Sequence, residues 1–373
     1  MVKPIIDRED RSLLGRWWRT VDPYLLTAFC LLLLIGGLMV ITASPAVAHR
    51  VGYDSYHFIL RQFVFLSVGV TTVFIISLLG QKDIRRLCTL GLAFGLLLML
   101  IVLYVGDETK GSTRWINIGS FSLQPSEFLK PCFYVFTAWM FSEKLKNKDF
   151  PGFAVAIALY LLVALLLVLQ PDIGTTLTFT LVWGAMFFMA GLPVILIAVF
   201  GLIAIVASVG AYLIFPHVSA RIDKFLSADT TQNYQVTKSL EAFAKGGIFG
   251  RGPGEGVVKE HIPDSHTDFI FAVLGEEMGL IAVLLVIGLF AFITLRVFIK
   301  LYRQNDIFVT LACAGIIMNF ALQAIINMGV TLKLMPTKGM TLPFISYGGS
   351  SLLATSISVG IILGLTRKRY DKR

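Results

Sequence analysis

Charged residues are scarce in this chain of 373 residues. Asp, Glu, Lys and Arg make up 15% of it, whereas hydrophobic residues make up 56% and the mean hydropathy is +0.79. Soluble domains are about one-quarter charged, so this composition excludes an ordinary soluble protein. The net charge of +9 is therefore not interpreted as a nucleic-acid-binding surface, and no nucleic-acid partner is expected.

Cysteine is scarce as well, and its placement excludes two further classes of protein. None of the four cysteines has the spacing of metal ligands, and all fall in apolar segments, which excludes both a disulfide framework and a zinc site. We interpret them as small buried hydrophobic residues. They are Cys30, Cys88, Cys132 and Cys313. The sequence also lacks internal repeats and low-complexity tracts, which predicts a single membrane domain over residues 1–373.

Long apolar runs, by contrast, are abundant. A helix needs about 20 residues to cross the roughly 30 Å of hydrocarbon in a bilayer. The runs predict an all-α, polytopic membrane protein with about ten transmembrane helices. They cover roughly 24–43, 58–79, 87–105, 124–142, 152–169, 173–190, 193–215, 269–295, 307–330 and 348–366. The first run is too long for a signal peptide and follows a polar tail, so we expect it to be an uncleaved span.

The distribution of Lys and Arg predicts how the spans are oriented. These residues gather before the first span and after the second, fourth, eighth and tenth spans, which all lie on one side of the membrane. The positive-inside rule makes that side cytoplasmic, with tails at 1–23 and 367–373. The opposite side carries a large extracytoplasmic loop, 216–268, between helices seven and eight. Loops of this length are usually functional or disordered.

One group of outward-facing polar residues surrounds the fourth span. Arg114 precedes the span, and Glu127 and Lys130 lie three residues apart near its start, so these two side chains can pair on one helical face. Lys130 has two interpretations. It is either a snorkelling lysine with its salt-bridge partner or part of a cationic site for an anionic headgroup. In the second case Arg114 would act as a planar fork and Lys130 as a point charge.

A second group lies in PDSHTDFIFAVLGEE, residues 263–277, at the start of the eighth span. On a continuous helix Asp268 and Glu276 would lie about 80° apart, two turns from one another. Ionisable groups inside a membrane are candidates for function. The alternative is that Thr267 and Asp268 only cap the helix. His261, His266 and Asp268 are a weak signal for a metal, and we predict no metal site from them.

Two glycine-rich segments complete the candidate regions. PFISYGGSS, which contains Ser350, favours close helix packing and leaves a backbone-lined pocket as the alternative. Lys333 and Lys338 precede it and add positive charge on the outer side. GRGPGEG, residues 250–256, resembles a phosphate loop but follows no strand, so we interpret it as a turn.

The charged groups cluster near one membrane surface, and charges in the middle of spans are almost absent. A proton or ion pump would need carboxylates near the middle of the bilayer. The distribution therefore favours chemistry or binding on a lipid-linked substrate at the outer interface over transport through the core.

Five motifs occur in order between residues 124 and 351, within a similarity that runs from about the first span to the C-terminus: QPSEFLK, QPDIGT, GGIFGRGPGEGVVK, HTDFIFAVLGEEMG and PFISYGGSS. Together they resemble the SEDS (shape, elongation, division and sporulation) family. The resemblance implies a peptidoglycan glycosyltransferase in the bacterial cytoplasmic (inner) membrane that polymerises lipid II, the undecaprenyl-pyrophosphate-linked disaccharide pentapeptide. GRGPGEG and Gly275 favour the division type, at the septum, over the elongation type.

The same resemblance implies partners and residue roles. The partners are a class B penicillin-binding protein, a transpeptidase that crosslinks the glycan, and other membrane proteins of the division machinery. Asp268 matches the essential acid of the family and would be the general base, while Arg114 and Lys130 would stabilise the pyrophosphate. We also expect four residues to bind substrate, namely Glu127, His266, Glu276 and Ser350. No cofactor is certain, and a divalent cation (Mg²⁺ or Mn²⁺) is left open.

Three alternatives remain beside the division-type polymerase. One is a lipid II flippase, which would have to pass a sugar-pyrophosphate through the apolar core. Another is an elongation-type polymerase of the same family. The third is a non-enzymatic scaffold that recruits a transpeptidase through its lipid-facing surface.

Overall fold

The computed structural model describes residues 12–109, 112–119, 121–191, 201–202, 206, 209–210, 212–214, 216–226 and 234–367. The expected span 193–215 therefore lies largely outside the described residues, as do 1–11 and 368–373 of the two predicted tails. The helices are α1 (Leu13–Thr20), α2 (Pro23–Val51), α3 (His57–Leu78), α4 (Gln81–Val105), α5 (Pro125–Lys146), α6 (Gly152–Leu169), α7 (Ile173–Met189), α9 (Pro216–Leu226), α10 (Tyr234–Gly246), α11 (Ile270–Tyr302), α12 (Ile307–Thr331) and α13 (Gly349–Leu365), with a 3₁₀ turn at Val258–His261.

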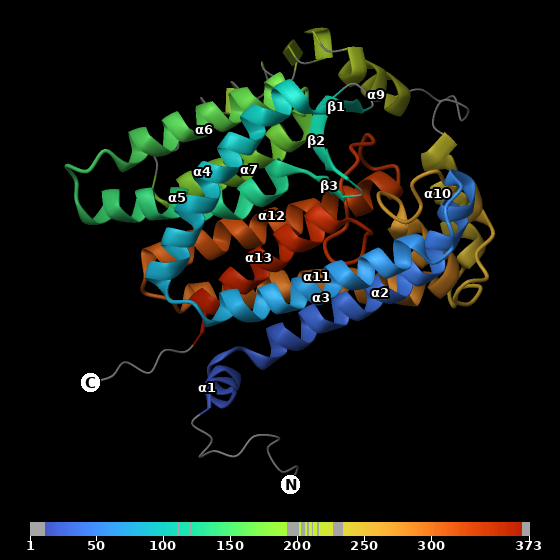
Figure 1. Cartoon of the computed structure of the whole chain (residues 1–373), viewed down its shortest axis with the longest axis horizontal. Helices are drawn as coiled ribbons and strands as arrows, with labels where there is room; N and C mark the ends of the chain where they lie inside the picture. The colour runs from blue at the N-terminus through green and yellow to red at the C-terminus, as the bar shows by residue number, and fades with distance from the viewer. Residues whose placement is uncertain are drawn as a thin grey trace.

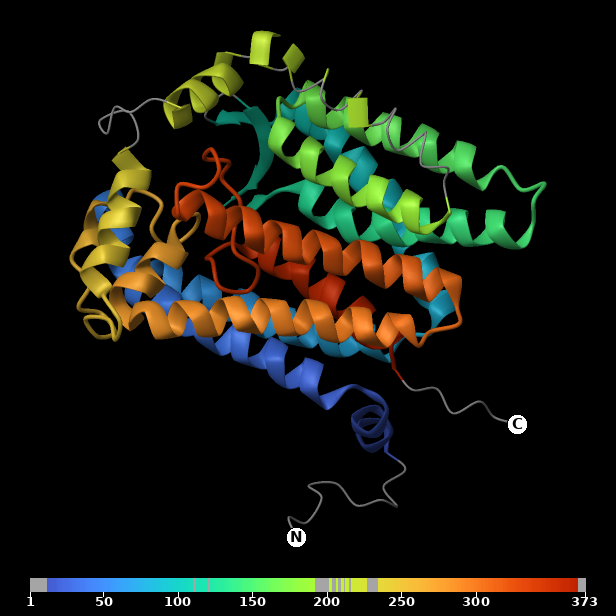
Figure 2. The same ribbon diagram turned by 180° about the vertical axis from the view of Figure 1, so that it is seen from behind.

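The long helices form a bundle in which they run side by side along one direction (Figure 1). The strands, α9 and α10 lie at one end of it, and the α5–α6 connection and the C-terminal end of α13 lie at the other, as the reverse view also shows (Figure 2). We name the end with the strands and α10 the outer end, following the charge distribution. Within the described residues, six helices are long and apolar enough to cross a membrane, and α7 and α13 are shorter apolar helices.

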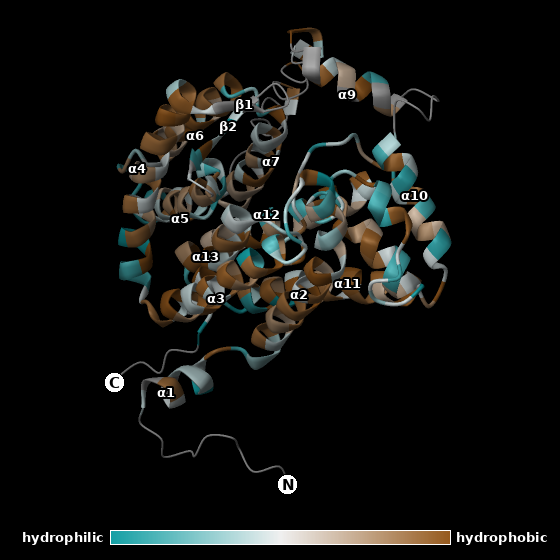
Figure 3. Cartoon of the chain, turned by 45° about the vertical axis from the view of Figure 1, so that its right-hand side comes forward, coloured by the Kyte–Doolittle hydropathy of each residue, from teal (hydrophilic) through white to brown (hydrophobic). Residues whose placement is uncertain are grey.

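α12 forms the centre of the bundle. In an apolar stretch of 18 residues taken from each helix, 67% of the residues are buried in α12, 28% in α11 and 22% in α3. α12 packs against α5, α7, α11 and α13. The outer helices instead expose leucine, isoleucine, valine and phenylalanine along their length, which the hydropathy colouring shows as brown ribbons (Figure 3). This pattern fits a bundle whose surroundings are lipid.

Aspartates begin three of the helices. Asp22 accepts hydrogen bonds from the backbone N–H groups of Tyr24 and Leu25, and Asp306 caps α12 in the same way. Asp172 accepts from Thr175 N and begins α7. Such caps satisfy N–H groups that have no partner within the helix, which matters most where water is excluded.

A small sheet corrects the all-α prediction. β1 (Asp107–Thr109), β2 (Ser112–Ile118) and β3 (Phe121–Leu123) form an antiparallel sheet in the order β1-β2-β3, with Ile116 opposite Leu123. The run from Thr113 to Ile118 is rich in β-branched and aromatic residues, and Gly119, at φ 61°, supplies the turn. The hairpin signal was therefore present but too short to be recognised beside the apolar spans.

Two spans differ from their expected bounds. α2 continues through Pro45 to Val51, so most of the loop expected at 44–57 is helical. α11 is interrupted at Gly279 (φ 75°, ψ −176°), so the span expected at 269–295 is divided into a short outer helix and a long one. Glycine is common in membrane helices, and only the tertiary contacts of Gly279 show that it ends one.

Candidate active site at the outer end of the bundle

A cavity of about 1170 Å³ occupies the outer end of the bundle. It is large enough for a ligand of several sugar rings, since pockets for drug-sized molecules measure about 300–1,000 Å³. Residues from α3, β2, β3, α5, α12 and α13 line it, together with the segments before α11 and before α13. Of the residues predicted as functional, Asp268, Arg114, Glu127 and Ser350 belong to this lining.

Asp268 is held in place through its own backbone and that of its neighbours. The Asn327 side chain on α12 donates Nδ2–H bonds to the carbonyls of Asp268 (2.9 Å) and Met340 (2.6 Å), and thereby joins the Asp268 segment to the loop before α13. Ser346 donates to the carbonyl of Thr267 at 2.6 Å. The carboxylate lies beside Gly339, where a Cβ would stand 3.3 Å from Asp268 Oδ2.

His266 supports this segment through ring packing. Its ring lies 4.9 Å from Phe58 and 5.2 Å from Tyr347, measured between centroids, and its carbonyl accepts a hydrogen bond from Tyr347 N at 2.8 Å. Burial lowers the pKa of His266 to about 4, so the ring is neutral at physiological pH. His266 is not part of the cavity lining, and its contacts indicate that it positions Asp268.

Cationic side chains gather in another part of the cavity wall. Arg114 on β2 lies 3.4 Å from Asp172 at the start of α7, and Lys130 lies 2.6 Å from Glu127 one turn earlier on α5. Glu127 faces the cavity, whereas the side chain of Lys130 is 2% exposed and lies behind it. Lys130 can therefore act on a bound ligand through its charge and through Glu127.

Lys338, from the loop before α13, joins this group. Burial lowers its pKa to about 7, the neighbouring charges of Lys130 and Arg114 contribute in the same direction, and Asp172 and Glu127 oppose the shift. Its Nζ and Arg114 Nε are buried and have no hydrogen-bond partner in the described part of the chain. The aliphatic part of Lys338 crosses Gly174, where any Cβ would clash with it. Three cations thus meet two carboxylates, and buried donors remain available to an anion.

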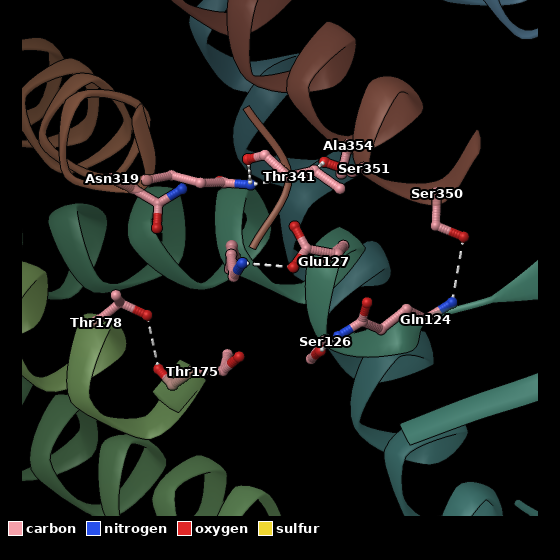
Figure 4. Close-up of polar contacts among 12 residues, drawn as sticks. Gln124, Ser126, Glu127, Thr175, Thr178, Asn319, Thr341, Ser350, Ser351 and Ala354 are labelled. Atoms are coloured by element: carbon pink, nitrogen blue, oxygen red, sulfur yellow. Dashed lines mark hydrogen bonds and ion pairs between the residues drawn. The ribbon is translucent and has the colours of Figure 1, made fainter. Parts of the chain in front are cut away.

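Glu127 lies between the elements that form this wall. Figure 4 shows it on α5, between Thr341 and Ser351 on one side and Thr175 on the other. Ser350, at the start of α13, lines the cavity, and its contact with substrate stays a prediction. Its hydroxyl donates to Ser122 O at 2.9 Å and accepts from Gln124 N at 3.2 Å, so it joins α13 to the β3–α5 connection.

Glu276 lies in a different environment from the one the sequence suggested. It is fully buried outside the cavity lining, and its two oxygens accept hydrogen bonds from the backbone N–H groups of Val257, Val258 and Lys259 at 2.8–3.0 Å. The carboxylate thus holds the segment after GRGPGEG, and its hydrogen-bonding capacity is used within the protein.

Sequence reasoning missed two residues of the site. Lys338 was recognised only as outer positive charge, although its place between a Pro-Thr and a Gly, in a loop that returns to the charged wall, could have drawn attention to it. Asn327 had a clearer signal, because an amide within an apolar helix needs polar partners. In the described residues no three His, Cys, Asp or Glu side chains are placed to hold a metal ion, and Asp172 and Glu127 already pair with cations. A divalent cation stays a prediction.

The fold and the site define a class of protein: a polytopic helical membrane protein whose outer end holds a cavity lined by an acid, Asp268, and by a cluster of cations. Residues 23–371 match the cell cycle protein family model that covers FtsW, RodA and SpoVE. The chain belongs to this family, the SEDS proteins, as its motifs predicted.

Relatives of known name agree with this assignment. The chain is 46% identical to the probable peptidoglycan glycosyltransferase FtsW of Caulobacter vibrioides, over 97% of this chain and 93% of that protein. It is 36% identical to the stage V sporulation protein E of Bacillus subtilis, over 94% and 98% of the two chains.

Solved structures share the fold. A chain of a peptidoglycan synthase complex, in which polymerization and crosslinking are coordinated, has a TM-score of 0.77 and 27% identity, covering 93% of this chain and 97% of that one. The rod shape determining protein RodA of Thermus thermophilus has a TM-score of 0.67 and 26% identity, covering 94% and 97%.

Proposed function

We propose that this chain is a peptidoglycan glycosyltransferase that polymerises lipid II at the outer face of the cytoplasmic membrane during septal wall synthesis. The names of its FtsW relatives support the activity. The observation that carries the proposal is that Asp268, Arg114 and Lys338 line the same cavity. Apolar helix faces leave room for polyprenyl chains around it.

The reaction needs a base and a site for a leaving anion. The 4-hydroxyl of the acceptor sugar attacks the anomeric carbon of the donor, and Asp268 takes the hydroxyl proton. The bond from that carbon to the lipid diphosphate breaks, and its electron pair leaves with the diphosphate. A positioned carboxylate contributes about 10²–10⁴ in rate. Asn327, Ser346 and His266 contribute by fixing the segment that carries it.

The cationic wall suits the departing diphosphate. Arg114 and Lys338 have buried donors without partners, so a polyanion that enters the cavity does not have to displace existing hydrogen bonds. Donors fixed in a desolvated site stabilise charge that develops in a transition state far more than the same donors in water. Lys130 raises the local potential from behind Glu127.

The test is glycan polymer formed from lipid II by purified protein with its transpeptidase partner. Asp268→Asn keeps the shape of the side chain and removes the base, so we expect loss of polymer, and the same for Asp268→Ala. Glu255→Gln, an exposed acid outside the cavity, is the matched control and should retain activity. Polymer yield from Asp268→Asn equal to the parent protein would remove the catalytic assignment.

The transpeptidase partner and the septal role are proposals of the same kind. The similarity to a chain of a synthase complex that coordinates polymerization and crosslinking supports a class B penicillin-binding protein as partner. Fluorescence imaging of the tagged protein distinguishes the roles, because a division protein gathers at mid-cell and an elongation protein along the side wall. Translocation of labelled lipid II in vesicles without polymerisation would favour a flippase instead.

A further inference from the structure

The interrupted helix α11 defines where the outer boundary of its membrane span lies. Beyond Gly279 the helix runs from Leu280 to Tyr302, which is 23 residues and about 34 Å. This length matches the roughly 30 Å of a bilayer core. Leu280, Ile281 and Leu284 are each half exposed or more on this stretch. The lipid-facing surface of α11 therefore begins at the first residue after the interruption.

A turn from the large loop lies directly against this boundary. The turn covers residues 247–250 and connects α10 to the GRGPGEG segment. The carbonyls of Gly247 and Ile248 accept hydrogen bonds from Leu280 N (3.0 Å) and Ile281 N (3.3 Å). On the other side of the interruption, the Glu276 and Glu277 carbonyls accept from the two residues after the turn, Arg251 N and Gly252 N, at 3.0 and 2.9 Å. The turn is thus fixed at the depth of the outer end of the span.

Glycines and a buried ion pair keep the turn at that depth. A Cβ at Gly250 would clash with the carbonyl of Glu277, and one at Gly279 would clash with Gly250 N, so both positions require glycine at this distance. Gly250 also has a φ of 80°, which favours glycine. Lys259 then secures the returning chain through a buried ion pair with Glu277 at 2.5 Å and a bond to Thr42 O on α2.

The two residues at the tip of this turn are apolar and exposed. The exposed fraction is 59% for Ile248 and 81% for Phe249, although both lie next to a rigid backbone contact. Lys245 and Arg251, on either side of them, are exposed cations. Apolar residues with cations on both sides are typical of segments that lie in the interface of a bilayer. Figures 1 and 2 show that α10, which leads into the turn, crosses the outer end of the bundle.

We propose that Ile248 and Phe249 insert into the outer leaflet and anchor the large extracytoplasmic loop to lipid. The occupant of this apolar tip is lipid because the tip is continuous, through two backbone hydrogen bonds, with the lipid-facing side of α11. Lys245 and Arg251 would then lie at the level of the phosphates. This anchor would hold the loop that carries Asp268 at a fixed depth relative to the leaflet that contains the lipid-linked substrate.

Spin labelling of the full chain in vesicles of phosphatidylethanolamine and phosphatidylglycerol tests this. Cys30 is the exposed cysteine and is replaced by serine, while the three buried cysteines are retained. A nitroxide is placed at Phe249→Cys, with Leu284→Cys as the lipid-side control and Glu255→Cys as the water-side control. The measured quantity is the ratio of collisions with oxygen to collisions with a water-soluble nickel chelate. We expect this ratio to be about threefold or more higher at position 249 than at 255, and so to approach the ratio at 284.

A second measurement covers the case in which a label disturbs the turn. In Phe249→Trp, brominated lipid should quench additional emission over the parent protein, whereas in Glu255→Trp it should not. Nickel accessibility at 249 equal to that at 255 would overturn the proposal. So would a label at 249 that leaves water only when the transpeptidase is added, because the tip would then be a protein-binding surface. Neither readout depends on polymerisation, so failure of the proposed activity leaves this test intact.

Discussion

Two regions at the outer end of the molecule bury charge in opposite ways. Around GRGPGEG, the Glu276 carboxylate accepts hydrogen bonds from three backbone N–H groups, and Glu277 forms an ion pair with Lys259 at 2.5 Å. Along the cavity wall, Arg114 lies 3.4 Å from Asp172, and Lys338 Nζ has no hydrogen-bond partner among the described residues. Both regions are rich in buried ions, but among their described residues the first leaves only an acceptor, Glu277 Oε2, without a partner, whereas the second leaves the donors Arg114 Nε and Lys338 Nζ and the acceptor Asp172 Oδ2.

The difference separates residues that hold the fold from residues available for a ligand. A buried charge whose hydrogen bonds are made within the protein stabilises that arrangement and has little capacity left for another molecule. A buried donor without a partner costs free energy in the empty protein, and that cost is relieved when an anion binds. We therefore expect substitutions in the first region to change stability and those in the second to change activity.

The largest effect on activity within this comparison is expected at Lys338. Lys338→Met removes one donor that we propose binds the diphosphate, which should lower kcat for polymerisation about 10²–10³-fold. The melting temperature should stay the same or rise, because burying an uncompensated cation opposes folding. Activity and thermal unfolding measured on one preparation check both parts, with Lys333→Met as the matched control. A fall in melting temperature with unchanged activity would reverse the roles of the two regions.

Glu276 should show the opposite behaviour. Glu276→Ala leaves three backbone N–H groups without an acceptor, and the two that are buried cost about 1–3 kcal/mol each, so a large loss of stability is expected. Glu276→Gln keeps one acceptor oxygen and should recover part of the loss. Thermal unfolding in detergent measures the effect, and activity is normalised to the folded fraction. A stable Glu276→Ala protein without activity would instead support the substrate-binding role that the sequence predicted for Glu276.

The pH dependence of the reaction sharpens the assignment of Lys338. Its pKa is lowered to about 7, so the side chain is charged below that value and loses its charge as pH rises through it. If the charge is needed, kcat/KM for lipid II falls on the alkaline side of about pH 7. In Lys338→Arg the cation persists at all accessible pH values, and this limb should disappear. His266, with a pKa of about 4, adds no change between pH 5 and 8. An unchanged limb in Lys338→Arg would assign it to another group.

The sequence predicted the features that depend on local pattern. Length and hydropathy predicted α6 with its observed bounds of 152–169 and predicted α12 to within one residue. This is because the low-energy form of an apolar run of that length in lipid is a helix. The motifs gave Asp268 and Glu127, and the family resemblance added Arg114; all three line one cavity.

What the sequence could not give depends on contacts between distant segments. Glu276 and Lys130 look like cavity residues when α11 and α5 are drawn as continuous amphipathic helices. Their real environments are set by the 257–259 amides, which come from another part of the chain, and by the depth of Lys130 behind Glu127. The interruption at Gly279 likewise requires the backbone of residues 247–252 to be in place.

Substitution of Ser350 should have the smallest effect on stability and activity among these predictions. It is also the closest test of the comparison between the two regions. Its hydroxyl makes two hydrogen bonds to the backbone, so Ser350→Ala should cost about 1 kcal/mol of stability and change activity only a few-fold. Ser351, next to it, faces the same cavity and bonds to the Thr341 hydroxyl, which makes Ser351→Ala a matched control. Thermal unfolding and a lipid II titration are measured for both. A Ser350→Ala protein with unchanged stability and a KM raised tenfold would show that the hydroxyl leaves Ser122 to bind substrate, and saturation within the fold would then no longer separate structural from functional residues.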